Sequence, residues 1–135
     1  MKISKLFLPL AIVFAGIIFT STSCSKDSVS SNTSQSATDG NWRLSLYFDN
    51  SDETNKFSGY TFSFNSNGQV SATNGTNTVA GTWSQTSSKF ILDFGATAPF
   101  SDLNDDWLIE EKTAASIKVK DDNPARNEKL QFVKL

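Results

Sequence analysis

The sequence predicts an all-β domain over residues 40–135, built as an eight-stranded antiparallel up-and-down barrel. Apolar and polar residues alternate with period two along this region, which is typical of strands that bury one face. The alternating segments number eight, and short turns rich in Asn, Gly, Ser and Asp join most of them. A closed barrel leaves no exposed strand edge. A two-sheet sandwich is the structural alternative, but no long crossover connection is seen.

The two clearest strands are predicted at residues 41–49 and 58–65. In the first, Trp42, Leu44, Leu46 and Phe48 alternate with polar residues, and in the second Tyr60, Phe62 and Phe64 do so. Asn67-Gly68 then predicts a hairpin, because both turn positions tolerate positive φ. A short strand around Val70 and Ala72 follows, and Asn74-Gly75 predicts the next hairpin.

Five further strands complete the predicted barrel, interrupted once by a different pattern. Near residues 98–105, Pro99 is followed by Phe100 and Leu103 at a spacing that predicts one short helical turn or a covering loop. Asp121-Asp122-Asn123-Pro124 predicts a turn between the last two strands. The five strands are expected at residues 76–85, 89–94, 106–113, 115–121 and 128–135.

The first 23 residues have the features of a secretory signal peptide. Lys2 and Lys5 precede an apolar stretch from Leu6 to Phe19, and small residues follow it. This stretch is shorter than the ~20 residues that a helix needs to cross a bilayer, so cleavage is expected rather than a permanent transmembrane anchor. The sequence therefore predicts export.

Cys24, the one cysteine in the chain, follows Ser21-Thr22-Ser23 in a pattern that resembles the lipobox of bacterial lipoproteins. Ser21 departs from the Leu that is usual there. The resemblance implies that Cys24 carries a lipid of several acyl chains and becomes the first residue after cleavage, which would give a stable membrane anchor. An ordinary secretory signal next to an incidental cysteine is the alternative.

Residues 24–39 are expected to form the lipidated Cys24 and a disordered tether. The segment is rich in Ser and Thr, and Val29 is its only sizeable apolar residue, so it cannot bury enough surface to fold. The predicted organisation is a signal peptide at 1–23, a tether at 24–39 and a β domain at 40–135. The expected location is the cell envelope, as an outer-membrane lipoprotein facing the periplasm or the cell surface.

The composition excludes several classes of function. Without the signal peptide, 10 basic residues stand against 14 acidic ones, so nucleic acids and anionic membrane surfaces, which both need clustered Lys and Arg, are not expected as partners. Histidine is absent and Cys24 is the only thiol, which removes Ser-His-Asp and Cys-His catalysis and the usual ligands of zinc, copper and haem. The sequence predicts a protein that is not an enzyme and has no cofactor or metal.

Short motifs in the β domain resemble those of lipocalins. Gly40-Asn41-Trp42 is similar to the Gly-x-Trp that opens the first lipocalin strand, and the series Phe62-x-Phe64, Gly68, Gly81-Thr82-Trp83 and Asp106-Trp107-Leu108-Ile109 looks like the lipocalin-like domain of small bacterial lipoproteins. Lipocalins commonly place an Arg from a late strand over that Trp. Here Arg126, Lys129 and Lys134 are near, and none matches clearly.

Two functions follow from this resemblance. The first is binding of a small apolar ligand inside the barrel, since eight strands enclose an interior just wide enough for side chains or one small ligand. The second is a structural or interaction lipoprotein of the envelope, with a barrel that its own aromatic residues fill and no ligand. If a ligand cavity exists, its lining is expected to comprise Trp42, Tyr60, Phe62, Phe64, Trp83, Phe90 and Trp107.

Three groups of carboxylates are further candidates for a site. Paired carboxylates can serve glycoside hydrolysis or bind Ca²⁺. Two of the groups lie in Asn/Ser/Asp-rich turns, where Asp bonds the local backbone, and neither has the spacing of an EF-hand loop. They are therefore interpreted as solvated surface features. The groups are Asp49, Asp52 and Glu53; Asp102, Asp105 and Asp106; and Glu110 with Glu111.

Overall fold

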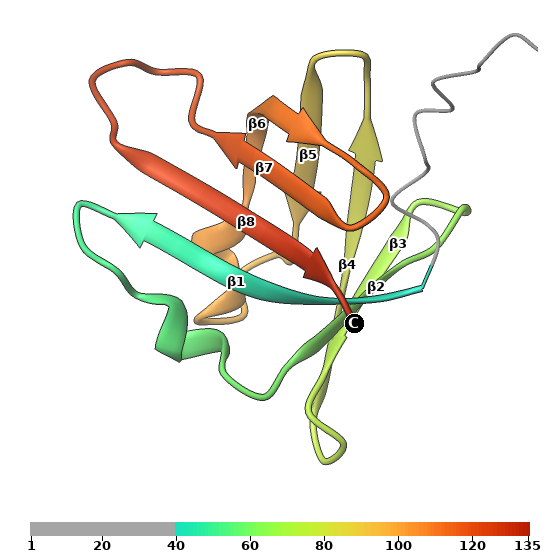
Figure 1. The fold of residues 1–135 in the computed structure, drawn as a ribbon. Helices are drawn as coiled ribbons and strands as arrows, with labels where there is room; N and C mark the ends of the chain where they lie inside the picture. Colours follow the sequence, from blue (N-terminus) through green and yellow to red (C-terminus); the bar gives the residue numbers. More distant parts are fainter. Residues whose placement is uncertain (1–39) are drawn as a thin grey trace, which may run out of the picture.

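The computed structural model describes residues 40–135, and they form one closed eight-stranded antiparallel barrel (Figure 1). The predicted signal peptide (1–23), Cys24 and the tether (24–39) lie outside the described residues. Consecutive strands pair in order, and the last pairs with the first. The strands are β1 (Asn41–Asp49), β2 (Thr61–Phe64), β3 (Gln69–Thr73), β4 (Thr78–Gln85), β5 (Lys89–Asp93), β6 (Asp105–Lys112), β7 (Ser116–Lys120) and β8 (Glu128–Lys134).

The up-and-down barrel confirms the fold predicted from the period-two alternation. The predicted helical turn near 98–105 is the 3₁₀ turn η2 (Phe100–Leu103). A second 3₁₀ turn, η1 (Thr54–Phe57), was not predicted. Its consequence is that β2 begins at Thr61 rather than at residue 58, because the backbone N–H of Tyr60 donates to the carbonyl of Phe57.

The Asn-Gly pairs form tight hairpins, as their sequence predicts. Gly68 has φ +84°, a conformation that side chains disfavour, and its N–H donates to the carbonyl of Asn65 at 3.0 Å. The Asn67 side chain accepts from the backbone N–H of Gln69 at 3.0 Å. Such local bonds fix the register of β2 with β3, which pairs Phe64 with Val70.

Strand β1 is paired unequally on its two sides. Its whole length from Trp42 to Asp49 pairs with β8, with a bulge between Leu44 and Leu46. Only Asn41 and Trp42 pair with β2. Beyond them the two strands diverge, as Figure 1 shows, and the connection that contains η1 covers the opening. There Thr54 Oγ1 accepts from the N–H of Tyr47 at 2.9 Å.

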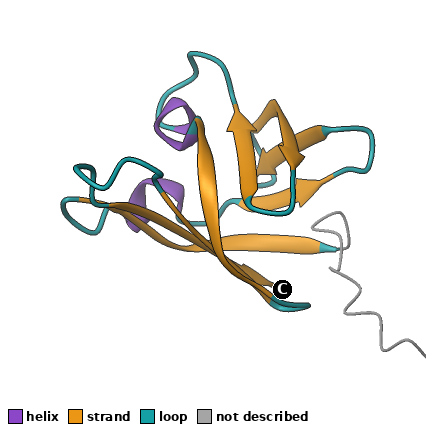
Figure 2. Ribbon diagram, turned by 90° about the horizontal axis from the view of Figure 1, so that it is seen from above, coloured by secondary structure: helices purple, strands orange, loops and turns teal. Residues whose placement is uncertain are grey.

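The two ends of the barrel differ in their connections. We call the end at which Gly40 enters β1 the tether end; it also holds the C-terminus and the hairpins 65–68, 86–88 and 113–115. The other, the far end, holds the connections 50–60, 74–77, 94–104 and 121–127. Figure 2 shows both 3₁₀ turns on the side of the barrel away from the chain's entry point. The longest connections are thus all at the far end.

In the part of the chain that the structure describes, no helix combines the length and the hydropathy that crossing a membrane requires.

Candidate functional site

Aromatic side chains from strands and connections fill the barrel interior. Ten rings form one continuous set of contacts with centroid separations of 4.9–6.2 Å, mostly edge-to-face, an arrangement that adds stability beyond simple burial. Phe132 lies at the middle, in contact with Phe62, Phe64 and Phe90. The ten are Tyr47, Phe57, Tyr60, Phe62, Phe64, Trp83, Phe90, Phe94, Phe100 and Phe132.

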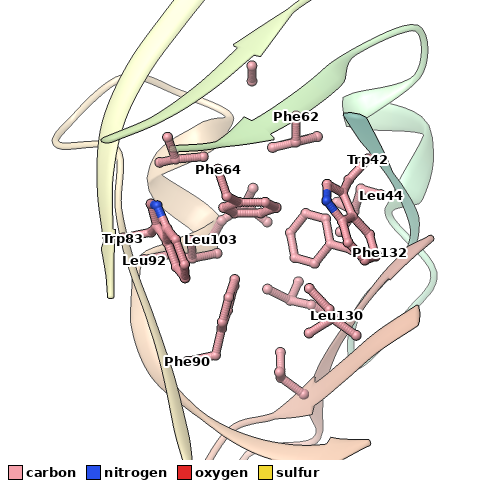
Figure 3. Close-up of a cluster of buried hydrophobic side chains, with 14 of the residues drawn as sticks. Trp42, Leu44, Phe62, Phe64, Trp83, Phe90, Leu92, Leu103, Leu130 and Phe132 are labelled. Atoms are coloured by element: carbon pink, nitrogen blue, oxygen red, sulfur yellow. The ribbon is translucent and has the colours of Figure 1, made fainter. Parts of the chain in front are cut away.

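The structure brings the seven predicted ligand-lining residues together. Six point into the interior, where each is at most 8 % exposed, and Figure 3 shows several converging on one cluster. Tyr60 differs, because it is half-buried at the far end, with its ring 4.9 Å from that of Phe100. The six are Trp42, Phe62, Phe64, Trp83, Phe90 and Trp107. Their role toward a ligand stays a prediction.

The three tryptophans differ in how their indole nitrogens are satisfied. Trp83 Nε1 donates to the carbonyl of Asn65 and Trp107 Nε1 to that of Leu103, both at 2.9 Å. Trp42 Nε1 is buried and has no hydrogen-bond partner. A buried unpaired donor is costly, so this atom is the polar group in the interior most open to a new acceptor.

A lysine covers Trp42 at the tether end. Lys134 of β8 is the register partner of Trp42, and its Nζ lies 5.8 Å from the centre of the indole ring, within the range of a cation–π contact. Of the three basic residues Arg126, Lys129 and Lys134, it is Lys134 whose cation lies over Trp42. Gly40 leaves room for it: a Cβ there would lie 2.8 Å from Lys134 Cε, and its φ of +82° also favours glycine.

Two shallow hollows lie on the outside of the barrel. One of about 280 Å³ separates β1 from the η1 connection, with Arg43, Asn55 and Tyr60 on its walls. The other, of about 430 Å³, lies beside the 121–127 connection and is lined partly by Leu108 and Arg126. Of the seven predicted lining residues, only Tyr60 borders either hollow.

Three carboxylates surround one arginine at the far end. Arg126 lies 2.7 Å from Glu128, 3.2 Å from Asp121 and 3.6 Å from Asp105. The side chains of Asp121 and Glu128 are 2 % and 9 % exposed, whereas that of Arg126 is 53 % exposed. Breaking a buried pair leaves an uncompensated charge, so Arg126 is what makes this acidic cluster tolerable in the fold.

The pKa values of three groups in and near this cluster are raised, first by burial and then by neighbouring carboxylates. Burial raises the pKa of Glu128, partly offset by Arg126, and burial also raises the pKa of Asp105. The pKa of Tyr47 is raised to about 12, first by burial and then by Asp102, Asp49 and Glu128. A Tyr47 hydroxyl at the far end therefore stays neutral at physiological pH.

The first and third predicted carboxylate groups lie in turns and surface ion pairs. Asp52 accepts hydrogen bonds from the backbone N–H and hydroxyl of Thr54, and Glu53 pairs with Lys56. On β6, Glu110 pairs with Lys120 and Glu111 with Lys118, both at 3.0 Å. In the second group Asp106 pairs with Lys89 at 3.1 Å, but Asp105 is only partly exposed and belongs to the Arg126 cluster, so its interpretation as a solvated residue was wrong. Within residues 40–135, no three His, Cys, Asp or Glu side chains are grouped as metal ligands.

Sequence reasoning missed the Arg126 cluster and the role of Phe57 in closing the far end, whereas the spacing of Phe100 and Leu103 predicted the turn that buries Phe100. Asp105, Asp121 and Glu128 come from three separate segments, and their encounter depends on the barrel register. Phe57 falls outside the period-two alternation, but its isolation between polar residues was a signal that it anchors a connection.

The fold and the interior define the structural class of the protein, which is a closed up-and-down β-barrel with a core of aromatic side chains. The chain matches no protein-family model, no curated protein and no solved structure.

Proposed function

We propose that the protein is an outer-membrane lipoprotein, anchored through acylated Cys24, whose filled barrel is a rigid scaffold for interactions in the cell envelope. The observation that carries this proposal is the continuous aromatic packing of the interior. A ligand pocket buries most of a drug-sized molecule in ~300–1,000 Å³ of space, whereas here side chains of the protein occupy the centre.

The scaffold role places the binding function on the outside of the barrel. Phe57 and Phe100 fix the two longest connections to the core, at 2 % and 1 % exposure. Loops held this way present their polar residues with little loss of entropy on binding, which favours recognition. We propose no catalytic role, since the charged groups of these connections serve in turns and ion pairs.

Binding of a small apolar ligand inside the barrel is the second candidate. It is supported by the unpaired Trp42 Nε1, which a carbonyl or ether oxygen of a ligand would satisfy. Such a ligand would have to displace the contacts that Phe132 makes with its neighbours. This makes it the weaker candidate.

Native mass spectrometry of the detergent-extracted protein tests both candidates at once. The scaffold proposal expects an N-terminus of acylated Cys24 and no bound molecule. Cys24→Ser provides the matched control, because it removes the acylation site without altering residues 40–135. Phe132→Ala supplies a positive control, since it opens an apolar cavity that a benzene-sized molecule should fill.

The outcomes separate the parts of the proposal. A small molecule retained by the natural sequence at near one-to-one stoichiometry would overturn the filled scaffold and favour ligand binding. A mature N-terminus without acyl groups would overturn the proposed anchor. Whether the barrel holds a ligand would then still be decided by the presence or absence of a bound small molecule in the same spectrum.

A further inference from the structure

We propose that the tether end of the barrel rests on the anionic headgroup surface of the membrane and that the acidic far end points away from it. This inference rests on the proposed lipid anchor at Cys24. It concerns a separate property, the orientation of the barrel, which the anchor does not fix by itself.

The topology delivers the chain to one defined end. Residue 40 enters β1 beside the C-terminus, where the N–H of Leu135 donates to the carbonyl of Asn41 at 2.9 Å. Sixteen residues, counted from Cys24 to Asp39, separate the proposed anchor from Gly40, and a chain of that length reaches at most about 55 Å when fully extended. That reach allows the barrel to tilt or invert, so surface forces decide its orientation.

The charges of residues 40–135 are divided between the two ends. Ten of the twelve carboxylate side chains lie in the far-end connections or within two residues of them. Four basic side chains lie in the same segments, and Lys89 reaches them from β5 to pair with Asp106 at 3.1 Å and with Asp122 at 2.5 Å, so this group has a net charge of −5. The other charged side chains, four basic and two acidic, lie toward the tether end or at mid-strand and sum to +2. The overall negative charge thus hides a strong polarity.

The tether end has a surface that suits headgroups. Its three hairpins, residues 65–68, 86–88 and 113–115, contain no charged residue. Arg43, near the start of β1, is exposed on the wall of the hollow beside the η1 connection and makes no ion pair with any described residue. Lys134, near the end of β8, lies over the Trp42 ring. Leu135, 66 % exposed, is the only exposed large hydrophobic residue among residues 40–135.

Screening turns this polarity into a preferred orientation. The Debye length is about 8 Å at physiological ionic strength, and the barrel height set by the tilted nine-residue β1 is about 20 Å. With the tether end down, the carboxylates of the 50–60 and 94–104 connections lie beyond the screened surface potential. Inverting the barrel brings them into it, where each is repelled by anionic lipid.

Fluorescence quenching by lipid headgroups measures this orientation. The chain 24–135 is coupled through the Cys24 thiol to a maleimide lipid, so that the measurement does not depend on natural acylation. A ketone-bearing amino acid in place of Ser87 (tether end) or Thr76 (far end), both exposed, carries the fluorophore. On vesicles with one-third anionic lipid and a quencher on the headgroup, we expect at least about threefold stronger quenching at position 87, falling toward equality in ~1 M salt.

Matched charge reversals sharpen the test. Arg43→Glu with Lys134→Glu reverses two basic residues of the tether end and should abolish the preference. Lys120→Glu with Lys129→Glu makes the same change in net charge at the far end and should preserve it; circular dichroism checks that both variants fold. Equal quenching at the two positions in the natural sequence, or stronger quenching at position 76, would overturn the proposed orientation. Failure of the anchor proposal is detected by a separate measurement: the protein extracted from cells would then lack the mass of the acyl groups on Cys24.

Discussion

The two ends of this barrel are closed by different means. At the tether end, tight hairpins and the first and last strands bring Trp42 and Lys134 together, so closure comes from the strands themselves. At the far end, the long connections insert Phe57 and Phe100 into the core and place a buried acidic cluster around Arg126. The comparison teaches that the far end depends on a few side chains outside the sheet, and there single substitutions should have their largest effects.

The largest expected effect comes from removing the aromatic plug of the far end. Phe100→Ala deletes a 1 % exposed ring that contacts Phe57, Tyr60, Phe62 and Phe94, and should lower the free energy of unfolding by about 3–5 kcal/mol. Urea denaturation followed by tryptophan fluorescence measures it. Thr97→Ala, an exposed change in the same connection, is the control. A cost below about 1 kcal/mol would mean that the far end does not need its plug.

The second expected effect is a pH-dependent loss of stability in Arg126→Met. The raised pKa of Glu128 means that the folded protein binds this proton more tightly than the unfolded chain, so stability declines as pH rises from the ordinary carboxyl pKa through the raised one. Removing Arg126 raises that pKa further, and the variant should lose more stability at pH 7 than at pH 4. Thermal melting at the two pH values measures this. Equal losses at both would show that the cation has no electrostatic role.

At the tether end the expected effect is smaller. Lys134→Met removes the cation above Trp42 and keeps the apolar stem, so we expect a cost of about 0.5–1 kcal/mol. Lys129→Met on the same strand is the matched control, since Lys129 is exposed and pairs with no described carboxylate. Chemical denaturation measures the free energy of unfolding of both variants. Identical values would mean that the cation–π contact does not stabilise the fold.

The smallest effect is electrostatic and affects one titration. Asp102→Asn should lower the pKa of Tyr47 from about 12, because Asp102 is the leading charge that raises it. Glu110→Gln makes the same change on β6 toward the tether end and should leave this pKa unchanged. Ultraviolet titration of tyrosinate follows it. A pKa of Tyr47 that responds equally to both variants would argue against the charge polarity of the barrel.

The fold was predictable because alternation is local. Trp42, Leu44, Phe62 and Phe64 follow the period of a half-buried strand, and the Asn-Gly pairs specify where the chain turns. The residues that point into the barrel were predictable for the same reason. The order of the strands then followed from the short hairpins, which leave antiparallel neighbours as the simplest arrangement.

What the sequence did not predict depends on tertiary encounters. Phe57 is buried by a 3₁₀ turn that breaks the alternation, and Arg126 meets Asp105 only because β6 and β8 flank β7 in the closed barrel. Net charge alone also concealed the polarity between the ends, because it sums residues that the topology separates. Predicting these features requires the strand register as well as the identity of the residues.

Xenon binding tests the central claim, a barrel interior filled by its own side chains, most directly. Xenon enters dry apolar cavities of the kind left by a deleted large side chain. In crystals under xenon pressure, we predict no xenon among Phe62, Phe64, Phe90 and Phe132 of the natural sequence and a bound atom there in Phe132→Ala. Xenon at full occupancy in the natural interior would contradict the filled barrel.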